Sequence, residues 1–264
     1  MVNEFRLDPE SLSFTLITNR SEGCKACKGK GNDIASAPFM RGRVKVYEIK
    51  DDVQPSKYEL SGEFFKSSLA DGYEEVIVDS DNHENKSKTF TVEEIEQLLS
   101  ILEDRINSLD KYKLGQNMMI TRTQEEHGYF DLLLLPIPRK ETKGCFECES
   151  LKNASNREIY STENFLVYVP FAPRSDFEIV VAPKRHIGFG QCDPMLLFDL
   201  AGVVKKLSGI HEKEATWAIS QNAGGHFKLK FLGGKANPYD LLEIKIATIN
   251  PDLLAKEIRE TKKL

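Results

Sequence analysis

The chain has 264 residues, of which 40% are hydrophobic and 29% are charged. These proportions are those of an ordinary globular protein and exclude collagen-like, disordered and membrane-spanning classes. The 36 Lys and Arg against 41 Asp and Glu leave a net charge of -5, which argues against binding nucleic acid over a large surface. The longest leucine run, 132–135, ends at Pro136, and the first ten residues carry charges where a signal peptide needs an apolar core. We therefore expect a cytoplasmic protein without a membrane partner.

Cys24 and Cys27 form the first of two Cys-x-x-Cys pairs, in a turn rich in Gly and Lys. In a reducing cytoplasm this spacing favours a metal over a disulfide. Thioredoxin-like redox chemistry is the competing use, but it needs a single pair between a strand and a helix. A tetrahedral zinc needs two further ligands, and the first histidines that follow are His83 and His127. We predict that these four residues bind a first zinc.

The segment around these histidines predicts a strand, a long helix and two more strands. Residues 73–80 favour a strand. A helix begins after Thr91, which forms a capping box with Glu94, and apolar residues repeat at helical spacing as far as Leu109. Two further strands precede and follow His127, over 117–121 and 132–135.

The second half repeats this order after a Pro-containing crossover. Cys145 and Cys148 form the second Cys-x-x-Cys pair. A strand then leads to His186, an amphipathic helix opens at Asp193 with a proline at its first position, and two strands flank His226. The strands are expected over 177–182, 216–220 and 227–232. We predict that the two cysteines and two histidines bind a second zinc.

The repeated order of cysteine pair, strands, histidine, helix, strand, histidine and strand indicates an internal duplication. We expect an N-terminal domain over 1–138 and a C-terminal domain over 139–264. Four protein ligands at each site leave no position for water, so both zinc ions are expected to be structural. A final helix is expected to turn Leu253, Leu254 and Ile258 inward.

Several segments resemble the galactose-1-phosphate uridylyltransferase family, a tandem member of the histidine-triad superfamily. They are EVIVDSDNH at 75–83, TVEEI at 91–95, FLVYVPFAPR at 165–174, FEIVVAPKRH at 177–186 and INP at 249–251. The resemblance implies a duplicated α+β fold, in which each half is an antiparallel sheet with one long helix, and two Cys2His2 zinc sites. It also implies a transferase that moves a uridylyl group through a covalent nucleotidyl-histidine, and a homodimer.

The catalytic motif departs from the family pattern. The family has His-Pro-His-x-Gln, in which the first histidine binds zinc and the second is the nucleophile, whereas this chain has HGYFD at 127–131. His127 keeps the metal position, Tyr129 stands at the nucleophile position and Asp131 at the glutamine position. A tyrosine has an ordinary pKa of about 10 and needs activation, and an aspartate repels an incoming phosphate. We expect the ordinary covalent route to be lost.

The second half has lost similar residues. Where the family commonly has His-x-His-x-His, this chain has HFKLK at 226–230, which keeps only the predicted zinc ligand His226. Lys228 and Lys230 alternate with apolar residues and therefore lie on one face of a strand. They form either a solvated strand face or an anion site for a phosphate.

Three functions remain open from the sequence. The first is a zinc-binding pseudoenzyme that serves as a nucleotide-binding, nucleotide-sugar-binding or protein-interaction module. The alternative is an active nucleotidyltransferase of the UDP-sugar:hexose-1-phosphate type with altered catalytic residues. The third is a zinc protein associated with RNA or a ribonucleoprotein. This third hypothesis depends on a basic patch around the first cysteine pair, made of Lys25, Lys28, Lys30, Arg41, Arg43 and Lys45.

Overall fold

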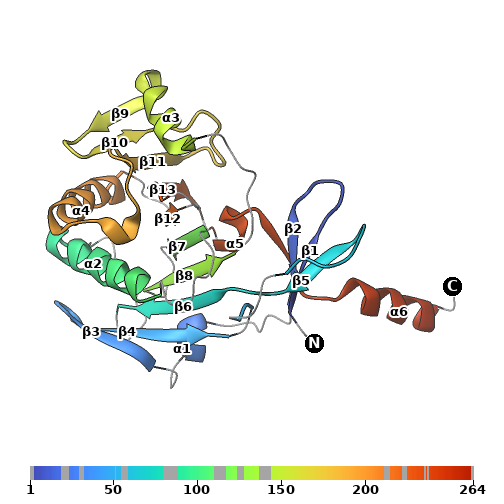
Figure 1. Ribbon diagram of the computed structural model, residues 1–264. Helices are drawn as coiled ribbons and strands as arrows, with labels where there is room; N and C mark the ends of the chain where they lie inside the picture. Colours follow the sequence, from blue (N-terminus) through green and yellow to red (C-terminus); the bar gives the residue numbers. More distant parts are fainter. Residues whose placement is uncertain are drawn as a thin grey trace.

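A large antiparallel sheet runs through most of the chain, and two long helices cover one of its faces (Figure 1). The computed structural model describes residues 3–18, 24–29, 33–50, 52–54, 59–79, 89–109, 117–123, 128–136, 144–210, 215–221, 225–234, 236 and 238–262. None of the helices in these ranges is long and apolar enough to cross a membrane.

The helices and strands of the described ranges are as follows. The helices are α1 (Lys25–Gly29), α2 (Val92–Leu109), α3 (Phe146–Lys152), α4 (Pro194–Ser208), α5 (Pro238–Leu241) and α6 (Pro251–Lys262), with short 3-10 turns at Ser155–Arg157 and Phe189–Gln191. The first eight strands are β1 (Glu4–Leu7), β2 (Phe14–Ile17), β3 (Asp33–Phe39), β4 (Gly42–Ile49), β5 (Lys66–Leu69), β6 (Tyr73–Val78), β7 (Asn117–Thr123) and β8 (Tyr129–Leu135). The others are β9 (Glu158–Ser161), β10 (Phe165–Tyr168), β11 (Glu178–Pro183), β12 (Ala215–Gln221), β13 (Phe227–Gly233) and β14 (Ile244–Ala247).

The large sheet has the same strand order on both sides of its centre. In the described residues the order is β3-β4-β6-β8-β7-β12-β13-β11-β10-β9. β7 and β12 pair at the centre, with Met119 opposite Ser220. In each half a long helix joins the third strand from the centre to the central strand, since α2 follows β6 and α4 follows β11. The order of elements therefore agrees with the order predicted from the sequence, and the α+β class is confirmed.

The main core lies between this sheet and the helices α2 and α4. Alternate side chains of each strand face the helices, and the apolar stripes of α2 and α4 meet them. The members with no solvent exposure include Leu102, Leu132, Leu200, Val204, Phe227 and Leu229. Burying one such side chain stabilises the fold by about 1.5–3 kcal/mol. Because side chains of both halves belong to this one core, their burial also holds the two halves together.

Both long helices begin where the sequence predicts. The Thr91 backbone N–H donates to the Glu94 carboxylate over 2.8 Å, and the Glu94 N–H donates to Thr91 Oγ1 over 3.2 Å. Asp193 caps α4 by accepting the Leu196 N–H over 2.8 Å, with Pro194 at the first helical position. These bonds satisfy backbone N–H groups that have no partner inside the helix.

The short helices α1 and α3 lie on the opposite face of the large sheet. Ala26 of α1 packs on Tyr47 and Val76, whereas their strand neighbours Val46 and Ile77 belong to the core beneath α2. α1 lies very close to β4, because a Cβ at Gly29 would be 2.5 Å from the Tyr47 Cβ. In the second half, α3 is followed by a segment that packs on the same outer face. Each Cys-x-x-Cys helix therefore lies on the face turned away from α2 and α4.

A second, four-stranded sheet in the order β14-β2-β1-β5 joins the two ends of the chain. β14 pairs in parallel with β2, so a strand of the predicted second domain completes a sheet of the first. The two domains predicted on either side of residues 138 and 139 therefore share this sheet. α6 extends away from this sheet (Figure 1), and the inward orientation predicted for its apolar residues is wrong. Leu253, Leu254 and Ile258 are 51%, 40% and 38% exposed.

Candidate functional site

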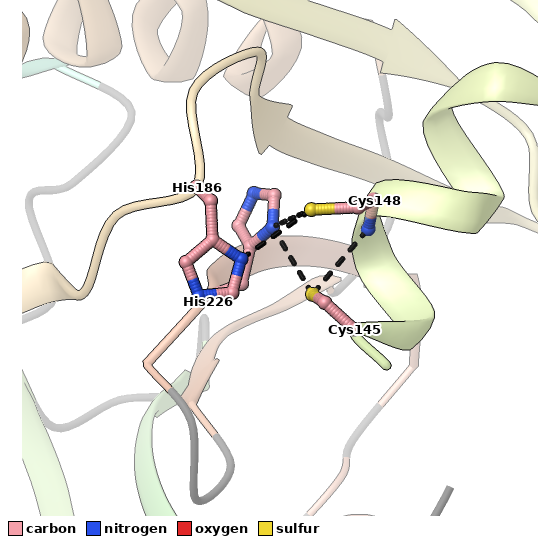
Figure 2. A group of neighbouring side chains, drawn as sticks. All are labelled: Cys145, Cys148, His186 and His226. Atoms are coloured by element: carbon pink, nitrogen blue, oxygen red, sulfur yellow. Dashed lines mark hydrogen bonds between the residues drawn. The ribbon is translucent and has the colours of Figure 1, made fainter. Parts of the chain in front are cut away.

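Four predicted zinc ligands of the second half meet at one point of the fold. Cys145 is the N-cap residue of α3 and Cys148 lies in its first turn. His186 follows β11, and His226 immediately precedes β13. Figure 2 shows the two sulfur atoms and two imidazole rings turned toward one another. One ligand atom from each residue lies within 4.8 Å of all the others, and none of the cysteines forms a disulfide.

The distances in this cluster fit a tetrahedral metal centre. The Cys145 Sγ lies 3.4 Å from His226 Nδ1, and the Cys148 Sγ lies 3.3 Å from His186 Nδ1 and 3.4 Å from His226 Nδ1. Zinc binds Cys sulfur at about 2.3 Å and His nitrogen at about 2.0–2.1 Å, which places tetrahedral S and N ligands about 3.5 Å apart. The two cysteines and two histidines therefore fit a metal ion with four protein ligands, which leaves no coordination position for a substrate.

His226 has the protonation state that a metal ligand needs. Its Nε2 lies 3.0 Å from the Pro183 carbonyl oxygen, so Nε2 carries the proton and donates it. Nδ1 then presents its lone pair to the sulfur atoms, in the arrangement typical of metal-binding histidines. Burial lowers the pKa of His226 and so favours the neutral ring.

The predicted first zinc site is only partly described. Cys24 immediately precedes α1 and Cys27 lies within it, while His83 and His127 lie outside the described residues. The zinc of this first site therefore stays a prediction.

Asp131, at the glutamine position of the motif, lies inside the protein. It is 6% exposed and accepts a hydrogen bond from Lys25 Nζ over 2.6 Å. Lys25, which lies between Cys24 and Cys27, also binds the fully buried Glu74. Although burial opposes its charge, the carboxylates of Asp131 and Glu74 raise the pKa of Lys25. Asp131 therefore lies against a buried cation, which it shares with Glu74.

The same contact corrects the predicted basic patch. Lys25 is buried in ion pairs, and the Arg41 guanidinium binds both carboxylate oxygens of Glu94. Arg43 donates to Ser36 Oγ over 2.7 Å, and Lys30 lies outside the described residues. Two of the six cations of this patch are therefore neutralised within the protein, which weakens the electrostatic support for an RNA surface.

Tyr129, at the nucleophile position, is the first residue of β8. Its side chain is half-buried against the apolar cluster that contains Ala26, and its backbone is in register with Val78. The aromatic ring thus lies on the same face of the sheet as the Cys-x-x-Cys helices.

Lys228 and Lys230 both face away from the main core, as alternation predicts, but each is paired. Lys228 binds Glu147, which is 5% exposed, and Lys230 Nζ lies 2.6 Å from Glu178, which is 3% exposed. The two glutamates neutralise the positive charges of Lys228 and Lys230, which an anion site would need. Sequence reasoning missed them, although Glu147 stands between the two cysteines of its pair.

The comparisons with known proteins agree on one fold. No family model matches the chain. The galactose-1-phosphate uridylyltransferase of Thermotoga maritima is 26% identical over an alignment of 161 residues, and the match covers 53% of this chain and 50% of that protein. The matched part thus spans about half the length of this curated relative.

Solved structures match over almost the whole chain. A uridylyltransferase aligns with a TM-score of 0.66 and 17% identity over 97% of both chains. An ADP-glucose phosphorylase from Arabidopsis thaliana with bound ADP-glucose aligns with a TM-score of 0.61 and 17% identity over 99% of both chains. A GalT-like protein from Arabidopsis thaliana aligns with a TM-score of 0.63 and 18% identity over 98% of this chain and 99% of the other. At these identities the structures show the fold. The chain therefore shares the fold of these proteins, and about half of it is also similar in sequence to a galactose-1-phosphate uridylyltransferase.

Proposed function

We propose that the protein binds a nucleotide sugar and does not form the nucleotidyl-histidine of uridylyl transfer. Tyr129 carries this proposal, because it stands at the first position of β8, where the family pattern has the nucleophilic histidine. A phenol with an ordinary pKa of about 10 is protonated at neutral pH. It is then a weak nucleophile unless a base activates it.

The residue at the glutamine position supports the loss of the covalent route. A glutamine amide can donate N–H groups to the oxygens of a reacting phosphate and so relieve their charge. Asp131 offers only acceptor oxygens when ionised, and one of them is held by Lys25. At these two positions the chain therefore has neither the histidine nor the glutamine of the family pattern.

Nucleotide sugars are proposed as the ligand class from the comparisons. The Arabidopsis ADP-glucose phosphorylase shares the fold over 99% of this chain and was solved with ADP-glucose bound. The sequence match to a uridylyltransferase points to the same class of ligand.

The metal of the Cys2His2 centre is proposed to be zinc with a structural role. Four protein ligands complete the coordination, and ligands from α3, β13 and the segment after β11 would be held together by one ion. Cys24, Cys27, His83 and His127 are proposed to hold a second zinc in the same way.

Active nucleotidyl transfer with altered residues is the second candidate. The observation that favours it is the match to a uridylyltransferase over 161 residues, since sequence similarity persists beyond the shared fold. In this candidate the nucleotide would pass directly between two bound substrates, or through the hydroxyl of Tyr129.

Binding and turnover can be measured separately on the zinc-loaded protein. Calorimetric titration with UDP-glucose and ADP-glucose should show saturable binding, whereas glucose 1-phosphate, which lacks the nucleoside, should bind much more weakly. Absence of binding up to about 1 mM, the upper end of ordinary KM values, would contradict the proposal.

Turnover is tested by phosphorus NMR with UDP-glucose plus galactose 1-phosphate, and with ADP-glucose plus inorganic phosphate. We expect no exchange of the nucleotide between sugars. Multiple turnovers that depend on protein concentration would instead establish the second candidate, and Tyr129→Phe would show whether the hydroxyl takes part.

A further inference from the structure

An ion pair connects two of the three chain segments that supply the metal ligands of the second half. Glu147 lies between Cys145 and Cys148, and its carboxylate binds the ammonium of Lys228. Lys228 lies two residues after His226 on β13. The ammonium also lies 5.7 Å from the centre of the Phe146 ring. The helix with the two cysteines and the strand next to His226 are thus joined by a contact that involves no metal.

A second ion pair extends this connection to the remaining ligand. Lys230 of β13 binds Glu178 at the start of β11, and β11 leads to His186. At the other end of β11 the Pro183 carbonyl accepts the His226 Nε2–H. The three segments that carry the four ligands are therefore held in place by charge and hydrogen bonding within the protein.

The first half contains the same type of contact with opposite sign. Lys25 lies between Cys24 and Cys27, as Glu147 lies between its cysteines, and it binds Asp131 on β8. β8 and β13 hold equivalent places in the strand order, each next to the central pair. In both halves a charged residue inside the Cys-x-x-Cys turn thus reaches an opposite charge on an inner strand.

We infer that Glu147 and Lys228 are positioning residues that set the geometry of the Cys2His2 centre before the metal binds. Ligands that are already in place lose less conformational freedom on binding, so the metal binds more tightly. The inference rests on the metal centre of the proposed function and not on its nucleotide ligand.

The test measures zinc affinity by competition with a chromophoric chelator for the wild type, Glu147→Gln, Lys228→Met and the double variant. Removal of a group that hydrogen-bonds a metal ligand typically costs about 10–100-fold in affinity. Glu147 and Lys228 act on the ligands through the segments that they join, so we expect each single variant to lose up to about 10-fold. The double variant should lose no more than either single one, because the same contact is broken. Glu149→Gln is the matched control, since Glu149 lies on the same helix but pairs with Lys152 at the surface, and its zinc affinity should not change.

The two single variants separate positioning from plain electrostatics. Through charge alone, loss of the Glu147 carboxylate would weaken binding of a cation, whereas loss of the Lys228 ammonium would strengthen it. If Glu147 and Lys228 position the ligands, both variants should bind zinc more weakly. The cobalt-substituted protein gives an independent readout, because its visible absorption reports tetrahedral geometry and should change in both variants.

Several outcomes would overturn the inference. Lys228→Met could bind zinc as tightly as the wild type or more tightly, or the losses of the two single variants could add in the double variant. If Lys228→Met does not fold, Lys228→Gln gives the deciding sign, because loss of the Glu147 carboxylate weakens zinc binding under either explanation. A wild type that binds no zinc at all would instead refute the proposed metal centre, so the two failures are distinguishable.

Discussion

Replacement of Lys25 by methionine should destabilise the protein more than any exposed lysine change. The Lys25 side chain is 9% exposed and lies between Glu74 and Asp131, whose side chains are 0% and 9% exposed. The variant keeps most of the apolar stem but leaves two buried carboxylates without their cation. Breaking a buried ion pair by removing one partner typically costs about 3–5 kcal/mol, which is a large part of the total stability of about 5–15 kcal/mol.

The assay is urea unfolding at pH 8 and pH 5, with Lys152→Met, an exposed lysine of an ion pair, as the control at both values. Burial raises the pKa of Glu74 from its ordinary value of 4.5 to about 8. A carboxyl group whose pKa is higher in the folded state stabilises the fold below its unfolded pKa, and this contribution is lost as the pH rises toward 8. Without Lys25 the carboxylates take up protons more readily, so the loss of stability should be larger at pH 8 than at pH 5.

The double variant Lys25→Met with Glu74→Gln should recover part of the lost stability, because it removes one of the two unpaired charges. An unfolding midpoint of Lys25→Met that equals that of Lys152→Met at pH 8, with an unchanged slope, would refute the reasoning.

Three further predictions concern the metal centre, the buried thiol and a helix cap. Cys145→Ser or His186→Ala should release one zinc equivalent per chain and destabilise the second half; native mass spectrometry counts the metal, and an unchanged count would exclude these residues as ligands. Burial raises the pKa of Cys192 to about 12, so its thiol should react with a disulfide reagent at pH 8 only after unfolding, and mass mapping that finds it modified in the native protein would contradict its burial. Thr91→Ala removes the cap of α2 and should lower the unfolding free energy by about 0.5–2 kcal/mol, as measured by urea unfolding against the wild type.

Local patterns were sufficient to predict the elements that carry the candidate site. The capping box at Thr91, the Asp193 cap and the alternation along β13 each depend on residues close in sequence, and the structure confirms all three. The second Cys2His2 set followed from ligand chemistry and the repeated order, and its four side chains do meet.

Contacts between distant segments could not be predicted in this way. Lys25 is 49 residues from Glu74 and 106 from Asp131, so a pattern of lysines in a turn is equally consistent with a solvated surface. The pairing of Lys228 with Glu147 spans 81 residues and depends on where α3 packs. The amphipathic pattern of α6 likewise predicts a helix, but it contains no information on whether another surface covers its apolar face.

The central claim is tested most directly by mass spectrometry of the zinc-loaded protein after incubation with UDP-glucose and ADP-glucose. Under native conditions we predict a non-covalent complex with at least one of them, and after denaturation the mass of the unmodified chain. A nucleotidyl adduct that survives denaturation and disappears in Tyr129→Phe would contradict the account, because Tyr129 would then be a nucleophile and the protein a covalent nucleotidyltransferase.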